Sequence, residues 1–210
     1  ASIDLPAFAG DAPEIALQGE FETQGNLDTA QAQGSLSGRA LQSPEFGDLS
    51  AALDLRWSDQ RLDLDAVHLV ETGSGALLDL AGWLDLSGGV PRFDLEGDWR
   101  RLRWPLFGAL LLASEQGQLI LKGDADDYDF QVDAQLSGAQ LPASRMQLQG
   151  VGDQQAARLQ DLQLDSLDGQ VLGKGLIEWS PDLTWDLALT ASELDPGQHW
   201  PALAGRLGFK

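Results

Sequence analysis

Apolar and polar residues alternate along most of this chain. Residues 62–66, 93–99, 128–134 and 185–189 carry Leu, Phe, Val, Trp, Tyr, Ala or Gly at every second position, mostly with Asp, Glu or Gln between them. A period of two places the apolar set on one face of a strand and the polar set on the other. A helix would need apolar residues at i, i+3 and i+4, which these windows lack. The pattern therefore predicts two-faced strands.

Turn-forming residues separate the alternating segments. Close spacing favours antiparallel neighbours, because parallel strands need longer crossover connections. We expect about a dozen strands. Residues 104–115 are the exception and could form a helix, since Pro105 suits a first turn, although Gly108 weakens it. The predicted turns, rich in Gly, Pro, Asp and Ser, are 58–59, 72–75, 87–89, 126–127, 152–153, 168–169 and 180–182.

Short sequences recur in the same order about 95–100 residues apart. Leu36-Ser37-Gly38 returns as Leu136-Ser137-Gly138, and Trp104-Pro105 returns as Trp200-Pro201. We predict two tandem β-units, residues 1–115 and 116–210. One such unit cannot cover its own apolar face and edges, so we expect the units to stack into one elongated, curled antiparallel sheet. Glycines inside the predicted strands mark places where a sheet bends.

Composition narrows the possible functions. The formal net charge is −20, which opposes binding to nucleic acid or broadside approach to an anionic membrane. The absence of cysteine excludes disulfides, thiolate nucleophiles and Cys-based zinc sites. The longest apolar stretch, residues 106–113, is far short of the ~18 residues of a membrane-spanning helix. Both ends suggest a piece of a longer protein.

No residue pattern indicates catalysis, a metal or a cofactor. The acidic segment 124–129 lacks the glycine at position six that an EF-hand loop requires, so we interpret it as a solvated turn. His68 and His199 stand outside any metal-binding or nucleophile motif. We therefore predict a protein that is not an enzyme.

An ordered set of short motifs resembles the periplasmic β-repeat region of the TamB family, among the AsmA-like, bridge-type lipid-transfer proteins. The motifs are residues 102–106, 117–123, 136–138, 167–169, 173–179, 185–187 and 194–197. The resemblance implies a β-taco, which is a bent sheet around a continuous apolar groove. It also implies a periplasmic segment of a protein anchored in the inner membrane. Phospholipid acyl chains would travel along the groove between the two membranes. TamA, an Omp85-type barrel, would bind through other parts of the parent protein.

Three functions fit these observations at the level of sequence. The first is the lipid-carrying groove. The second is a chaperone-like scaffold that pairs with strands of nascent outer-membrane proteins and works with an Omp85-type partner. The third is a passive β-repeat stalk with a closed core. For the first, the groove-lining candidates on the dominant face of each strand are Ile15, Leu17, Phe21, Leu53, Leu55, Trp57, Leu62, Leu64, Leu78, Leu80, Leu84, Leu86, Phe93, Leu95, Trp99, Leu119, Leu121, Phe130, Val132, Leu136, Leu148, Ile177, Leu187 and Leu189.

Overall fold

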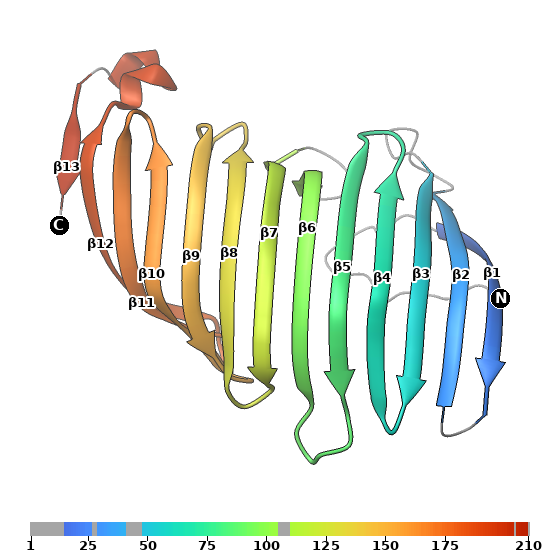
Figure 1. The fold of residues 1–210 in the computed structure, drawn as a ribbon. Coiled ribbons are helices and arrows are strands. Elements are labelled where there is room, and N and C mark those ends of the chain that lie inside the picture. The colour runs from blue at the N-terminus through green and yellow to red at the C-terminus, as the bar shows by residue number, and fades with distance from the viewer. Residues whose placement is uncertain (1–14, 27–28, 41–47, 105–109, 204, 210) are drawn as a thin grey trace.

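One antiparallel sheet forms the fold, with its strands in the order of the sequence (Figure 1). The computed structural model describes residues 15–26, 29–40, 48–104, 110–203 and 205–209. The prediction of an all-β, curled antiparallel sheet is confirmed. The strands are β1 (Ile15–Gly25), β2 (Thr29–Ala40), β3 (Leu49–Ser58), β4 (Arg61–Glu71), β5 (Ala76–Asp85), β6 (Arg92–Trp104), β7 (Leu112–Asp124), β8 (Tyr128–Ser137), β9 (Ser144–Gly152), β10 (Ala156–Ser166), β11 (Gly169–Glu178), β12 (Thr184–Leu194) and β13 (Leu207–Phe209).

Tight turns keep successive strands adjacent. Asp59 and Gln60 join β3 to β4 with φ of 49° and 63°, and both values lie in the left-handed region that two-residue hairpin turns use. At the β7–β8 connection the Asp124 carboxylate accepts hydrogen bonds from the backbone N–H groups of Asp126 and Asp127. The acidic segment therefore builds a turn, as the sequence indicated, and its first carboxylate serves the backbone.

Bulges interrupt the regular pairing at several points. The register shifts in β4 between Leu64 and Val67, and in β7 between Ser114 and Gln116. Such bulges bend a strand and increase its twist. The strands change direction gradually along the sheet, and β11 and β12 curve away from the line of the central strands (Figure 1).

The expected helix at 104–115 is not what the described residues form. Trp104 ends β6, and β7 already begins at Leu112; residues 105–109 lie outside the described part. Pairing of residues 112–114 with β6 outweighs the local preference of Pro105 for a first helical turn. Two short 3₁₀ helices, η1 (Pro196–Gln198) and η2 (Pro201–Leu203), connect β12 to β13.

Candidate functional surface

Cross-strand register gathers the apolar residues of the sheet on one side, which we call the apolar face. Paired residues of neighbouring antiparallel strands share a face. One unbroken row of such pairs, the central apolar row, crosses β1 to β12 and contains only Phe, Val, Leu and Gly. Its members are Phe21, Gly34, Leu53, Val67, Leu80, Gly97, Leu119, Val132, Leu148, Leu162, Gly173 and Leu189.

The opposite side, the polar face, has the complementary composition. One residue further along each strand, the paired row runs through Glu20, Ser35, Ala52, His68, Asp79, Asp98, Gln118, Asp133, Gln147, Gln163, Leu172 and Thr190. Carboxylates and amides dominate this row. The two faces therefore differ in chemistry over almost the whole width of the sheet.

Nearly all residues that the sequence predicted as groove-lining share the apolar face. The register places all of them there except Ile15, Leu17 and Leu86. Ile15 and Leu17 lie in β1, but their side chains are outside the described part. Leu86 follows the end of β5, and its N–H donates to the Gln60 carbonyl. Whether these residues contact a lipid stays a prediction.

Sequence reasoning missed apolar-face residues that follow a bulge. Counting every second residue from Leu62 and Leu64 leads to Ala66 and His68. The shift after Leu64 instead puts Val67 on the apolar face, opposite Leu53 and Leu80. Leu162 follows a similar shift in β10. The available signal was the pair of adjacent apolar residues Ala66 and Val67. Two apolar neighbours change the phase of the alternation, and such a change marks an extra residue in the strand.

The apolar face has no second layer over it among the described residues. Of their hydrophobic side chains, only Ala51, Ala76, Ala134, Leu159 and Ala191 are buried, and no large side chain is fully buried. Most face residues are half-buried by their neighbours within the sheet. Phe21 near one edge and Trp185 near the other are 50% and 67% exposed. A broad apolar surface of this kind is typical of surfaces that bind a ligand or a partner.

Large side chains lie flat across glycines of the neighbouring strand. A Cβ added at Gly117 would overlap the Trp99 indole, and one added at Gly34 would overlap the Phe21 ring. The Trp99 Nε1 donates to Ser114 Oγ at 2.8 Å, which fixes the indole in this position. Because these aromatic rings lie flat over glycines of the neighbouring strand, the apolar face stays flat and continuous.

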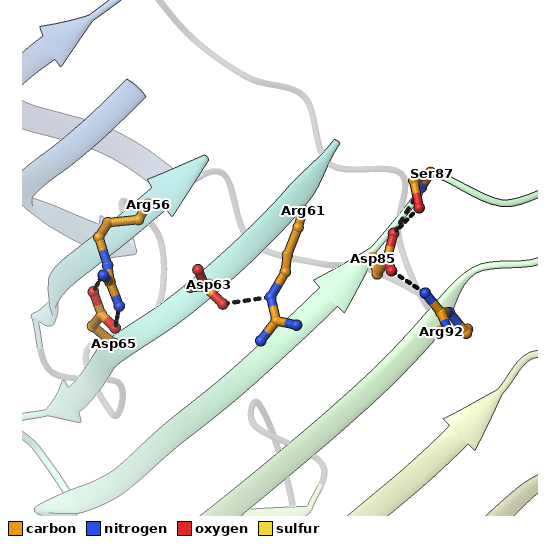
Figure 2. Close-up of polar contacts among 7 residues, drawn as sticks. All are labelled: Arg56, Arg61, Asp63, Asp65, Asp85, Ser87 and Arg92. Carbon is orange, nitrogen blue, oxygen red and sulfur yellow. Dashed lines mark hydrogen bonds and ion pairs between the residues drawn. The ribbon is translucent and has the colours of Figure 1, made fainter. Parts of the chain in front are cut away.

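Ion pairs and short polar contacts hold the polar side near the turns (Figure 2). Arg56 binds Asp65 through two hydrogen bonds, Nε to Oδ2 at 2.5 Å and Nη2 to Oδ1 at 2.6 Å. This contact raises the pKa of Arg56 and lowers the pKa of Asp65. The Asp85 carboxylate accepts from the Ser87 hydroxyl and N–H and from Arg92, which lower its pKa to about 2. These two carboxylates are therefore stabilised as anions.

A hollow of about 550 Å³ lies on the polar face across β5 to β9. Asp79, Asp98, Arg100, Asp133 and Arg145 contribute to its lining. Arg145 pairs with Asp133 at 2.9 Å, and the His68 ring lies 2.5 Å from Asp79. In the described ranges, no group of three His, Cys, Asp or Glu side chains is placed to hold a metal ion.

Comparison with known proteins identifies the family. The model described as "TamB, N-terminal domain" matches residues 70–210, which is two-thirds of the chain. The chain belongs to the TamB family. TamB proteins are cell-envelope proteins with a general role in outer-membrane assembly or lipid transport, and the family works with TamA at the outer membrane. They are transport or assembly proteins and not known enzymes. No solved structure matches the chain.

The TamB match begins within β4, but the surface does not change there. The central apolar row runs without interruption from β1 through β3 into the matched strands. Within the described ranges, no helix is long and apolar enough to cross a bilayer.

Proposed function

We propose that the apolar face is the wall of a groove that carries phospholipid acyl chains between the inner and outer membranes. The observation that supports this function is the central apolar row, which continues over twelve strands. At a strand spacing of about 4.8 Å the row extends about 50 Å. Such a length suits a conduit rather than a pocket for one small ligand.

The energetics favour acyl chains as the occupant. Moving one CH₂ group from water to apolar surroundings is favourable by about 0.8 kcal/mol of free energy. The face residues remain partly accessible, so an acyl chain that lies on them removes apolar area from water on both partners. Because the row changes little from strand to strand, a chain can move along it without meeting a polar barrier. A periplasmic position and a partnership with TamA through other parts of the parent protein belong to the same proposal.

A second candidate function is the chaperoning of outer-membrane protein strands, whose apolar residues would lie on the partly accessible apolar face. A closed-core stalk gains no support, because no second layer covers the apolar face among the described residues.

The test compares charges added to the two faces of the same strand. Leu80→Asp and Leu187→Asp place a carboxylate on the apolar face. Ala81→Asp and Ala188→Asp add the same charge one residue away, on the polar face. Lipid that co-purifies with each variant is measured by native mass spectrometry, and circular dichroism checks the fold.

We expect lipid with the unaltered chain and with the two Ala variants, and little lipid with the two Leu variants. Equal lipid in all folded variants, or none with the unaltered chain, would remove the lipid-carrying proposal. Capture of an unfolded outer-membrane protein that the two Leu variants lose, without any lipid, would favour the second function.

A further inference from the structure

The same bulge occurs in β4 and in β10, six strands apart and at the same level of the apolar face. Between Leu64 and Val67, β4 has two residues, whereas the facing strands β3 and β5 each have one. Between Leu159 and Leu162, β10 likewise has two residues, whereas β9 and β11 each have one. Val67 and Leu162 both belong to the central apolar row. The two bulges therefore match in their level and in the face that they leave unbroken.

A left-handed residue repeats at the same interval of six strands. Arg101 near the end of β6 has φ 51°, and Glu193 near the end of β12 has φ 56°. In the described part of the chain, the other non-glycine residues with positive φ lie in turns rather than in strands. Leu102 and Leu194 follow directly, and each pairs with the next strand. Because few residues other than glycine adopt this conformation, its recurrence indicates that β6 and β12 are equivalent.

Two kinds of connection repeat in the same order. In the β1–β2 and β7–β8 turns, the Oδ1 atoms of Asn26 and Asp124 accept a hydrogen bond from the backbone N–H three residues on, at 2.9 and 3.0 Å. The first residues after β5 and β11 are Leu86 and Trp179. Their N–H groups donate to a carbonyl of the turn before β4 or β10, at 2.8 and 2.9 Å. Bulges, left-handed residues and connections all relate β1–β6 to β7–β12.

A glycine faces each bulge on the following strand. Gly82 in β5 pairs with Leu64, and Gly175 in β11 pairs with Leu159. A Cβ at either glycine would overlap a carbonyl oxygen of the next strand, β6 or β12. The backbones therefore approach closely beside each bulge. Because a bulge bends its strand and increases the twist, a glycine at this place lets the neighbouring strands follow the bend.

We propose that the apolar face consists of two equivalent six-strand units, β1–β6 and β7–β12, and that the bulge in the fourth strand of each unit sets the curvature of the groove. The units divide in the β6–β7 connection, before residue 115. The part of this inference that concerns the groove rests on the proposed function. At a strand spacing of about 4.8 Å, the two bulges lie about 29 Å apart along the sheet.

Curvature matters to an acyl chain because its binding depends on the apolar area that it removes from water. In a curved groove the chain contacts apolar side chains on more than one side, whereas on a flat sheet it contacts them on one side only. The extra residue of each bulge lies off the apolar face, between two residues that are on it. The bulges therefore shape the groove without changing its chemistry.

The experiment removes the bulges and leaves the two faces unchanged. Deletion of Ala66 and of Gln160 restores a single residue between the flanking apolar-face residues of each strand. Every other residue then keeps its face, because the strand has a period of two. The control, Ala66→Ser/Gln160→Ser, alters the same positions and keeps the chain length. Small-angle X-ray scattering measures the shape, circular dichroism measures the strand content, and titration with phosphatidylcholine that carries a fluorescent acyl chain measures lipid affinity.

We expect the double deletion to stay folded and to straighten the sheet, which scattering detects as a larger maximum dimension. Its affinity for phosphatidylcholine should fall about tenfold, the effect of losing contact with about two CH₂ groups. Each single deletion should produce a similar, smaller change in shape, because the units are equivalent. The control should keep the shape and the affinity of the unaltered chain.

Each other outcome overturns a stated part of the inference. An unchanged scattering profile of the folded double deletion would exclude the bulges as the cause of curvature. Unequal effects of the two single deletions would exclude the equivalence of the units. A straightened sheet with full affinity would exclude a role of the bulges in the groove. If the unaltered chain does not bind the lipid, the proposed function fails, whereas the scattering data still test the units.

Amide hydrogen exchange of the unaltered chain gives a test that does not depend on a variant that folds. A bulge leaves an amide outside the ladder of hydrogen bonds. The amides of residues 65–66 and 160–161 should therefore exchange faster than those of Leu69 and Leu164, which lie in regular parts of the same strands. Slow exchange at either bulge would overturn the equivalence of the two units.

Discussion

The Trp99 Nε1 donates a hydrogen bond to Ser114 Oγ at 2.8 Å, although simple alternation from Gly117 would put residue 114 on the polar face. A bulge at Glu115 returns Ser114 to the apolar face. The Ser114 hydroxyl in turn donates to the Gln116 carbonyl at 3.2 Å. A short polar chain therefore satisfies the one donor of the indole, and the ring can serve as apolar surface.

Ser114→Ala should destabilise the chain because it leaves the Trp99 N–H without its acceptor. Ser114 is buried and the indole is half-buried, so we expect a loss of about 1 kcal/mol in the free energy of unfolding. Denaturant unfolding of Ser114→Ala, Trp99→Phe and the double variant gives the coupling between the two residues. Additive effects would show that the bond does not hold the ring.

Gly117 and Gly97 lie on the apolar face in the neighbouring strands β7 and β6, and they allow a controlled comparison of two glycines. A Cβ at Gly117 would overlap the Trp99 ring and approach the Asp133 carbonyl oxygen to 2.7 Å. A Cβ at Gly97 would meet only ordinary contacts, with Leu80 at 3.5 Å and the Asp79 oxygen at 3.6 Å. Gly117→Ala should therefore cost about 1–3 kcal/mol. Gly97→Ala should be neutral or stabilising by about 0.5 kcal/mol, because it restricts the unfolded chain.

Thermal or urea unfolding of Gly117→Ala and Gly97→Ala measures the stability of each variant. Equal destabilisation by the two alanines would mean that glycine is needed for general flexibility of the sheet. Stabilisation by Gly117→Ala would contradict the flat position of the Trp99 ring.

Alternation predicted the strands and the two faces well, because period two is a direct consequence of strand geometry. Leu119, Leu121, Phe130 and Val132 fall on one face as expected. Such prediction fails where an extra residue enters a strand. Val67 was missed for this reason, since a bulge depends on the neighbouring strand as well as on local sequence.

The sequence could not predict whether the apolar face is covered. The same Leu and Phe pattern builds the inner face of a closed sandwich and the face of an open sheet. Half-buried residues such as Leu80 and Val132 differ from core residues only in what lies above them.

Low pH should remove the contribution of the Asp85 carboxylate to the stability of the fold. Its carboxylate accepts hydrogen bonds from the Ser87 hydroxyl, the Ser87 N–H and Arg92, and its pKa in the folded chain is about 2. The unfolded value is about 3.9. Because the pKa of Asp85 is lower in the folded chain, its carboxylate stabilises the fold fully above the unfolded pKa. This stabilisation is lost as the pH falls through the folded pKa.

Asp85→Asn should therefore lower the melting temperature at pH 7, with the difference closing between about pH 4 and pH 2. Ser87→Ala removes the hydroxyl that contributes most to the lowered pKa, and it should narrow this pH dependence. A melting-temperature difference that stays constant from pH 7 to pH 2 would contradict this role for Asp85.

Two features of the sheet oppose each other in solution. The apolar face favours association of copies, whereas a net charge of −20 keeps them apart. The Debye length falls from about 30 Å at 0.01 M salt to about 3 Å at 1 M. Salt should therefore decide whether copies meet.

We expect sedimentation velocity to show monomers at low salt and self-association at high salt, because screening removes the repulsion and leaves the apolar face exposed. Val132→Asp, in the central apolar row, should suppress the association. Gln131→Asp adds the same charge on the polar face of the same strand, and it should have little effect at high salt. Suppression by both variants would indicate that charge alone controls association. Association that persists with Val132→Asp would place the contact elsewhere than the apolar face.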